Sequence, residues 1–248
     1  MHNDKISSDV NRCPTGVAAS INLAFSPRET ESSVRLCGAP LDPSLGVYEL
    51  KPTKLTDLEI IELSRELLNV YESGFLLSNA TEKQKCLERL DDLSDHIKGS
   101  DHILVARKEG HAVAFLCGVV LETTLGKTYH LKGLICHSSM QGKGVGELLL
   151  RLGVTRADAT LLCMHTQSLK MLKLFSRIAE SSENVALKLA SSVPSVNLEG
   201  VIDRGRYRGR CLYGDFETFQ HYAIPSLDTK HGDALFVAGL LKDRNKDG

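Results

Sequence analysis

The sequence predicts an α/β fold, in which a mixed, twisted β-sheet is flanked by helices. Short apolar runs typical of strands alternate with segments whose apolar residues recur at helical spacing, in the order β-α-α-β-β-β-α-β-α-β-β. The 248 residues are 42% hydrophobic and 25% charged, which is enough apolar material for a sizeable core. We expect one domain over residues 47–248, preceded by a poorly ordered, flexible arm over residues 1–46 that is rich in Ser, Asn, Pro and Gly.

Capping residues and helical spacing define the first elements of the domain. Val47–Leu50 is typical of a short strand. Thr56–Glu59 has the Thr-x-x-Glu pattern of a capping box, and Gly74 suits the end of the helix that begins there. A second helix is expected from Thr81 to Gly99, because its apolar residues form one stripe.

Strands and helices alternate in the rest of the chain. The Lys-Glu-Gly segment 108–110 between two apolar runs predicts a hairpin turn. A helix that carries Leu148, Leu149, Leu152 and Val154 is expected after a glycine-rich turn, and another over about residues 168–179. Strands are expected at His102–Arg107, His111–Glu122, Thr128–Cys136, Ala159–Met164, Arg210–Phe216 and Ala234–Leu241.

Charge, apolar runs and cysteines argue against several classes of protein. There are 30 Lys and Arg against 31 Asp and Glu, so we expect neither nucleic acid nor a membrane surface as a partner. The longest apolar run, Ala112–Leu121, is about half the ~20 residues that a membrane span needs, and the first residues lack the pattern of a signal peptide. The 7 cysteines form no C-x-x-C pair and no zinc-ligand spacing, which predicts reduced thiols, no metal and a cytoplasmic location.

The most informative segment is the glycine-rich stretch Gln141–Gly146, between an expected strand and an expected helix. Glycines there allow a close approach, and successive N–H groups at a helix start can hold a phosphate or pyrophosphate. The P-loop pattern is absent, and Glu147 stands where a dinucleotide fingerprint needs its third glycine. The segment satisfies Gln/Arg-x-x-Gly-x-Gly/Ala instead. The alternative is an ordinary strand-to-helix connection in which glycine serves geometry alone.

This hexapeptide, with the strand before it and the strand–helix pair after it, resembles the GNAT superfamily of N-acetyltransferases. The resemblance spans about residues 47–241, with its specific residues between Thr128 and Phe175. It implies direct acetyl transfer from acetyl-CoA to an acceptor amine in a ternary complex. It also implies that backbone amides of the turn hold the pyrophosphate, at Gln141, Gly142, Lys143, Gly144, Val145 and Gly146.

The resemblance also implies roles for the preceding strand and for the helix that follows. Leu134, Ile135 and Cys136 would pair with the pantetheine arm, and the Leu134 N–H would polarise the thioester oxygen. The family spacing Asn-x-x-Ala-x-x-x-Tyr corresponds to Ser168, Met171 and Phe175. Ser168 is expected to bond the cofactor arm or to cap its helix. Phe175 can pack on the cofactor but cannot replace the tyrosine as a proton donor.

Two residues are candidates for the base, because a lysine-type amine with a pKa near ~10.4 must lose a proton before it attacks. His130 lies eleven residues before Gln141, where histone-type members of the family carry a glutamate; otherwise it is a hydrogen-bonded strand residue. Glu122 is the next candidate, or else a strand-end charge. Cys136 and His137 would point to opposite faces of an extended strand, which argues against a Cys–His nucleophile.

The remaining roles stay open at this stage. The CoA thiolate is expected to take its proton from water or from Tyr207, Tyr213 or Tyr222. The basic run Arg204–Arg210 is a solvated hairpin loop, or it contacts the CoA 3′-phosphate, RNA or an acidic partner.

The sequence therefore predicts an acetyl-CoA-dependent N-acetyltransferase whose acceptor is a small-molecule or protein amine. The first alternative is a non-catalytic acyl-CoA-binding regulatory module, which Phe175 and the missing strand glutamate favour. A second alternative is an acyltransferase for a longer acyl chain. No motif indicates the acceptor or the oligomeric state.

Overall fold

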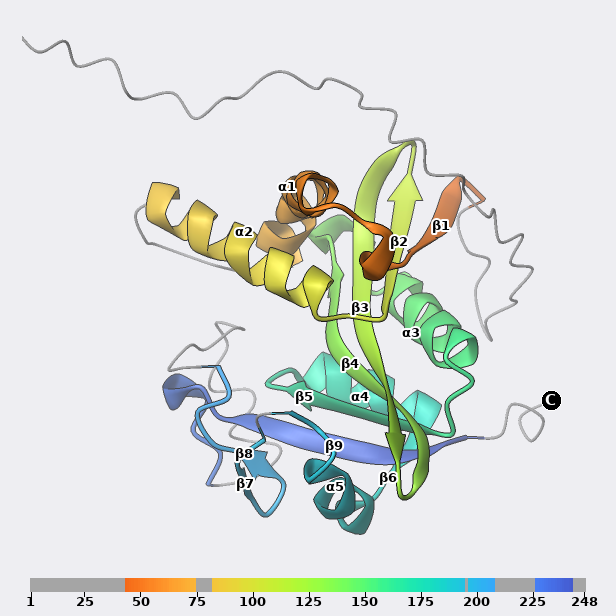
Figure 1. Cartoon of the computed structure of the whole chain (residues 1–248), viewed down its shortest axis with the longest axis vertical. Helices are drawn as coiled ribbons and strands as arrows, with labels where there is room; N and C mark the ends of the chain where they lie inside the picture. Colours follow the sequence, from red (N-terminus) through yellow and green to blue (C-terminus); the bar gives the residue numbers. More distant parts are fainter. Residues whose placement is uncertain (1–42, 75–81, 195, 208–225, 243–248) are drawn as a thin grey trace, which may run out of the picture.

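The computed structural model describes residues 43–74, 82–194, 196–207 and 226–242, with side chains described outside 82–88. In this part of the chain the strands form one mixed nine-stranded sheet, in the order β1-β2-β3-β4-β5-β9-β8-β7 with β6 paired to β9 (Figure 1). The predicted helix-flanked mixed sheet is confirmed. Residues 1–42 of the predicted arm and the predicted strand Arg210–Phe216 lie outside the described residues.

The first half of the sheet is an antiparallel meander with two helices packed on it. Its strands are β1 (Leu45–Leu50), β2 (His102–Lys108), β3 (His111–Thr123) and β4 (Gly126–Cys136). A 3-10 turn (Pro52–Lys54) precedes α1 (Asp57–Gly74), and α2 (Glu82–Lys98) follows it. The capping box is confirmed: the Thr56 N–H donates to Glu59 Oε2 at 2.7 Å and the Glu59 N–H to Thr56 Oγ1 at 3.3 Å.

The second half begins with a parallel crossover. After a 3-10 turn (Ser138–Met140), α3 (Val145–Arg156) leads from β4 to the parallel strand β5 (Leu161–Thr166). The later elements are α4 (Leu169–Ile178), β6 (Ala179–Ser181), α5 (Glu183–Ala190), β7 (Leu198–Glu199), β8 (Ile202–Asp203), a 3-10 turn (Thr229–His231) and β9 (Ala234–Leu241). The elements β6, α5, β7 and β8 were not predicted, because such short segments carry little periodic pattern.

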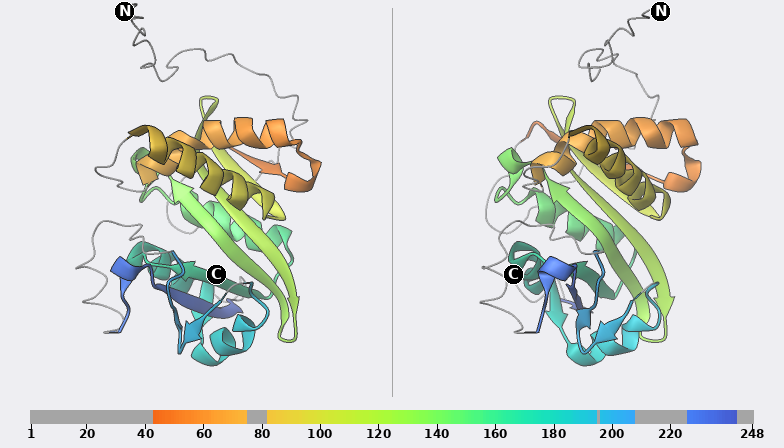
Figure 2. Two further views of the ribbon diagram at one scale, coloured as in Figure 1. Left: turned by 60° about the vertical axis from the view of Figure 1, so that its left-hand side comes forward. Right: turned by 90° about the vertical axis from the view of Figure 1, so that its left-hand side faces the viewer.

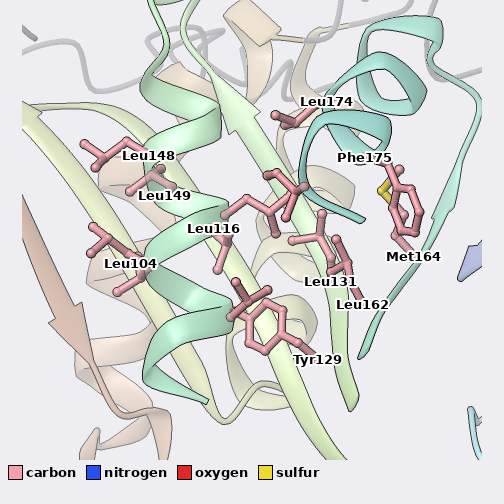
Figure 3. Close-up of a cluster of buried hydrophobic side chains, with 14 of the residues drawn as sticks. Leu104, Leu116, Tyr129, Leu131, Leu148, Leu149, Leu162, Met164, Leu174 and Phe175 are labelled. Carbon is pink, nitrogen blue, oxygen red and sulfur yellow. The ribbon is translucent and has the colours of Figure 1, made fainter. Parts of the chain in front are cut away.

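The sheet has a separate core on each face. Leu104 and Ala106 of β2 pack in the cluster that contains α3, whereas Ile103 and Val105 pack in the cluster of α1 and α2. Figure 3 shows the first cluster, to which Leu148 and Leu149 of α3, Leu116 of β3 and Tyr129 of β4 all belong. In Figure 2, α1 and α2 lie at one end of the long β3–β4 hairpin, and β5, β9 and α5 gather at the other.

An extra residue interrupts the pairing of β3 with β4. Cys117 pairs with Gly133, but its neighbour Gly118 pairs with Leu131, so Lys132 is the additional residue of a β-bulge. A bulge bends the strand that carries it and increases its twist.

Strands β4 and β5 diverge at this bulge. Their parallel pairing ends with Leu131 opposite Met164, although β4 continues to Cys136 and β5 to Thr166. Leu131 and Leu134 both pack in the α3 cluster although they are three residues apart, as expected when a bulge lies between them. The fold therefore opens the sheet beside the end of β4.

Candidate functional site

A turn with two left-handed glycines joins the end of β4 to α3. Gly142 and Gly144 have φ values of +77° and +80°, and nothing lies within 4 Å of a Cβ built on either. Gly144 is the residue immediately before α3. Glycine is favoured at both positions because L side chains rarely adopt this backbone conformation.

Several backbone donors of the turn and of the start of α3 have no acceptor among the described residues. Among the described residues, no acceptor bonds the N–H groups of Gly142, Gly144, Val145 and Gly146. The N–H groups of Gln141 and Lys143 are already bonded, to Ser138 O at 3.3 Å and to Met140 O at 3.4 Å. Free donors at the positive end of a helix suit an anion, so four of the six predicted amides have the chemistry that a pyrophosphate needs.

The charges around this turn also favour an anion. Lys143 is exposed on the turn, and Lys170 of α4 donates from Nζ to Gln141 Oε1 at 3.1 Å. The carboxylate of Glu147, in the first turn of α3, is paired with Arg151 at 2.9 Å and with Arg177 at 3.2 Å. Its negative charge is thereby offset.

A pocket of about 90 Å³ lies where β4 and β5 diverge. It is lined by residues 131–135 of β4 and 164–166 of β5, by Phe115, by side chains of α1 and α2, and by Met171 and Tyr207. The pocket and the amide turn therefore lie beside the same segment of β4, with the pocket before its end and the turn after it.

Of the three strand residues predicted to meet the pantetheine arm, Leu134 and Ile135 line the pocket and Cys136 does not. Burial raises the pKa of the Cys136 thiol to about 11, so the thiol is protonated near neutral pH. His137 Nδ1 contacts Ser139 Oγ at 2.9 Å. Nothing in this geometry joins Cys136 and His137 as a nucleophilic pair.

The two α4 residues that the resemblance singled out have structural roles. Ser168 caps the helix, because its Oγ accepts the Met171 N–H at 3.4 Å. Phe175 is only 2% exposed and packs in the α3 cluster (Figure 3). Neither lines the pocket, whereas Met171 does. Contact of Ser168 or Phe175 with CoA stays a prediction.

His130, the first candidate base, lies behind the pocket wall. Its side chain does not line the pocket, and its Nε2 is buried with no hydrogen-bonding partner in the described part of the chain. Burial, together with the neighbouring His165, lowers the pKa of His130 to about 3. Its ring packs edge-on against His165, with 5.6 Å between ring centroids, and His165 does line the pocket.

Glu122, the second candidate, lies away from the pocket. It is exposed and pairs with Lys127 near the tip of the β3–β4 hairpin. Lys127 lies four residues before Leu131, which at ~3.3 Å per residue puts it about 13 Å from the point where the strands diverge. The structure does not bring Glu122 to the site.

Sequence reasoning missed most of the polar side chains that line the pocket. On the helical wall, the Tyr71 hydroxyl donates to Asp92 Oδ2 at 2.8 Å, and His96 Nδ1 lies 2.8 Å from the Asp92 carbonyl oxygen. On the strand wall, His165 Nε2 lies 2.9 Å from Asp203 Oδ2. The spacing of Asp92 and His96 on one helix face was a usable signal, but no spacing connects β5 with the two-residue strand β8.

The described part of the basic run is bound to carboxylates. Arg204 Nε lies 2.7 Å from Glu199, and Arg206 Nε lies 3.9 Å from Asp203. Both side chains are partly exposed, at 30% and 25%, so the solvated loop stays a prediction for this run. Residues 208–210, Tyr213 and Tyr222 lie outside the described residues.

Two classes of site are missing from the described ranges. No described helix has the length and apolar character needed to cross a membrane. Within the same residues, no three His, Cys, Asp or Glu side chains come together as a metal site.

Several solved structures of acetyltransferases are similar to this chain. It is similar to an aminoglycoside acetyltransferase from an uncultured soil metagenomic sample, with 16% identity over 64% of this chain and 94% of that chain and a TM-score of 0.40. An IAA acetyltransferase from Bacillus cereus has 16% identity over 80% of this chain and 100% of that chain, with a TM-score of 0.41. The ribosomal-protein-S18-alanine N-acetyltransferase from Escherichia coli has 11% identity over 82% of this chain and 98% of that chain, with a TM-score of 0.44.

These likenesses are distant, and no curated protein matches the chain. Residues 64–175 of the sequence match the model of the acetyltransferase (GNAT) family. That segment runs from α1 through the diverging strands and the amide turn to α4. This segment of the chain is therefore similar to the GNAT acetyltransferase family.

Proposed function

We propose that this protein transfers an acetyl group from acetyl-CoA to an acceptor amine by direct attack in a ternary complex. The observation that carries the proposal is the set of four unbonded N–H groups beside the diverging strands. A diphosphate fits the donors, and an extended arm fits the unpaired edge of β4, which leads from the turn toward the pocket.

Open space and positive charge around the turn also support the binding of acetyl-CoA there. Gly142 and Gly144 leave the outer side of the turn open, and Lys143 and Lys170 add positive charge there. The backbone of Leu134–Cys136 would hold the pantetheine arm, and the Leu134 N–H would bond the thioester oxygen as negative charge develops on it.

The acceptor would approach from the helical side of the pocket. Asp92, His96 and Lys132 all line it. Asp92 gives a site for a positively charged amine, which suits a small-molecule amine or the amino group of a protein. The amine nitrogen forms a bond to the carbonyl carbon while the bond to sulfur breaks, which yields an amide and CoA.

Calorimetry with acetyl-CoA tests the site through two matched glycines. Gly144→Glu places bulk and negative charge against the pyrophosphate, so we expect the affinity to fall by more than about 100-fold. Gly110→Glu is the control, because Gly110 has φ +81° and equally open surroundings but lies in the β2–β3 turn. Equal affinities for the two variants would contradict the assigned turn.

A non-catalytic acyl-CoA-binding module is the second candidate. It is favoured by the absence of a tyrosine hydroxyl at Phe175 and by the absence of a carboxylate among the β4 residues that line the pocket. Release of CoA thiol, followed against a panel of alkylamines, diamines and lysine-containing peptides, separates the two. Binding of acetyl-CoA without any acetylated product would select the module. Parallel titrations with succinyl- and long-chain acyl-CoA test the length of the acyl chain.

A further inference from the structure

A histidine that lines the strand side of the pocket is paired with a buried carboxylate. His165 of β5 lies just beyond Met164, where the pairing with β4 has ended, and it lines the pocket. Its side chain is 5% exposed, and Nε2 lies 2.9 Å from Oδ2 of Asp203, whose side chain is 1% exposed. The angle of this contact is not that of a hydrogen bond. Neither Nε2 of His165 nor Oδ2 of Asp203 has a hydrogen-bond partner among the described residues.

Asp203 is charged in spite of its burial. Burial acts to raise the pKa of its carboxyl, but contacts with His165, the Asn197 N–H and Arg206 act in the opposite direction, and the pKa is lowered. The Asn197 N–H donates to Oδ1 at 2.8 Å. A carboxylate facing Nε2 favours the tautomer with the proton on Nε2, which leaves Nδ1 of His165 as the proton acceptor.

The groups around the ring keep His165 neutral near pH 7. Burial lowers its pKa, Asp203 opposes that effect and the Arg206 cation adds to it. His130 of β4 packs edge-on at 5.6 Å between ring centroids, and Phe236 of β9 lies at 4.8 Å. The remaining polar neighbours are Lys132, which lines the same pocket, and Tyr207, whose hydroxyl donates to the His165 carbonyl oxygen at 3.4 Å.

We propose that His165 is the base that takes the proton from the acceptor ammonium, with Asp203 as the positioning residue that fixes its tautomer. The inference rests on the proposed acetyl transfer and assigns a proton acceptor within that same site. It differs from the role predicted for His130, whose ring lies behind His165 and does not line the pocket.

The proton and electron movements balance without a further reactant. The acceptor enters as an ammonium and gives one proton to His165 Nδ1, which frees its lone pair. The nitrogen then bonds to the carbonyl carbon as the carbon–sulfur bond breaks. The second N–H proton goes to the departing thiolate through solvent, and His165 returns its proton to bulk water. The products are an amide, CoA thiol and one proton.

His96 is the main competitor for this role. Its Nδ1 lies 2.8 Å from the Asp92 carbonyl oxygen, so Nδ1 carries the proton and Nε2 is the free acceptor. It differs from His165 in lacking a buried carboxylate that faces its protonated nitrogen closely, because Asp92 Oδ1 is 3.9 Å away. The His96→Gln variant must therefore be measured beside His165→Gln.

The first experiment compares two amines that differ in protonation and little in size. Each enzyme is assayed with the best alkylamine of the panel and with its β-trifluoro analogue, which is largely unprotonated at pH 7. We expect His165→Gln to lower kcat/KM by about 100-fold or more for the alkylamine and to change it little for the analogue. Acetyl-CoA affinity by calorimetry should stay the same.

Its control is His102→Gln. His102 also belongs to a histidine–carboxylate pair on a strand, 3.3 Å from Glu49, but it does not line the pocket. Equal losses for both amines in His165→Gln, or a selective loss in His96→Gln alone, would overturn the proposal. If the wild-type protein acetylates no amine at all, the proposed function itself fails.

The second experiment needs no acceptor. NMR of protein labelled with ¹⁵N in histidine reports which ring nitrogen carries the proton, and His165→Gln assigns the signal. We expect a protonated Nε2 and a bare Nδ1 at pH 7, and loss of this preference in Asp203→Asn. A proton on Nδ1 in the wild-type protein would refute the assignment whatever the acetyl-transfer result. In the assay, Asp203→Asn should also shift the pH range over which kcat/KM for the alkylamine rises.

Discussion

Gly118 of β3 lies directly against the hydroxyl group of Tyr129 of β4: a Cβ at Gly118 would be 2.1 Å from the phenolic oxygen. The same hydroxyl would be 2.8 Å from a Cβ at Gly153 of α3. Tyr129 is completely buried, so its ring cannot move aside. The two glycines thus let one aromatic side chain pack between the central strands and α3.

We predict that Gly118→Ala destabilises the protein by about 1–3 kcal/mol, because the added methyl group overpacks a core with no free space. Urea denaturation measures the free energy of unfolding. The control is Gly46→Ala on β1, where the three atoms nearest to the new methyl group are the outer atoms of the Tyr48 side chain, the closest at 3.1 Å. Equal effects at the two glycines would show that Tyr129 can shift.

Ser168→Ala should separate helix capping from cofactor binding. We expect a loss of about 1 kcal/mol in the free energy of unfolding and no change in acetyl-CoA affinity, because the Ser168 hydroxyl accepts the Met171 N–H. Ser182→Ala is the matched control, since Ser182 caps α5 with the same 3.4 Å geometry away from the pocket. A large drop in affinity for Ser168→Ala alone would instead support the contact implied by the family resemblance.

His130 should make the protein sensitive to acid. Its folded-state pKa of about 3 is below the ~6.5 of an unfolded histidine, so the unfolded state binds more protons between these values. The stability is therefore complete above pH ~6.5 and is lost as the pH falls toward 3, by up to about 1.4 kcal/mol per pH unit. His130→Gln removes this contribution. If the free energies of unfolding of the wild-type protein and of His130→Gln changed equally from pH 7 to pH 4, the burial of a neutral His130 ring would be contradicted.

The Cys136 thiol should take no covalent part in acetyl transfer. Because burial raises its thiol pKa to about 11, we expect no acetyl-enzyme by mass spectrometry and slow alkylation by iodoacetamide at neutral pH. Cys136→Ala should keep kcat within a few-fold of the wild-type value. Accumulation of a covalent acetyl adduct that disappears in this variant would mean that transfer passes through the sulfur.

Lys170→Met should weaken acetyl-CoA binding with a smaller effect than a change in the backbone turn. Lys170 contacts Gln141 at the edge of the turn, so its charge reaches the bound diphosphate across exposed, salt-screened space. We expect a loss of affinity of a few-fold that shrinks as the salt concentration rises. Lys173→Met serves as the control on the same helix. The same loss at every salt concentration would indicate lost packing and not lost charge.

The sequence was most informative where local geometry restricts residue choice. The Thr56 capping box, the left-handed glycines of the turn and the strand β9 all follow from short-range patterns, and the structure confirms them. The family resemblance followed from the same turn. These features require no knowledge of what lies opposite in the fold.

The polar lining of the pocket depends on contacts between distant segments, which a single sequence does not show. His165 meets Asp203 only because β8 pairs with β9 and β9 with β5. His130 was singled out by its distance from Gln141, yet the pairing of β4 with β5 buries its ring against His165. Likewise the short elements β6, α5, β7 and β8 are stabilised by tertiary packing more than by their own pattern.

The opening in the sheet depends on a single additional residue of β4, Lys132. If that residue alone were deleted, every other side chain of β4 would keep its present face, and both cores would retain their contacts. The strand would, however, lose its bend and could stay in step with β5 as far as Thr166. A chain one residue shorter is therefore expected to form a sheet that stays closed between β4 and β5.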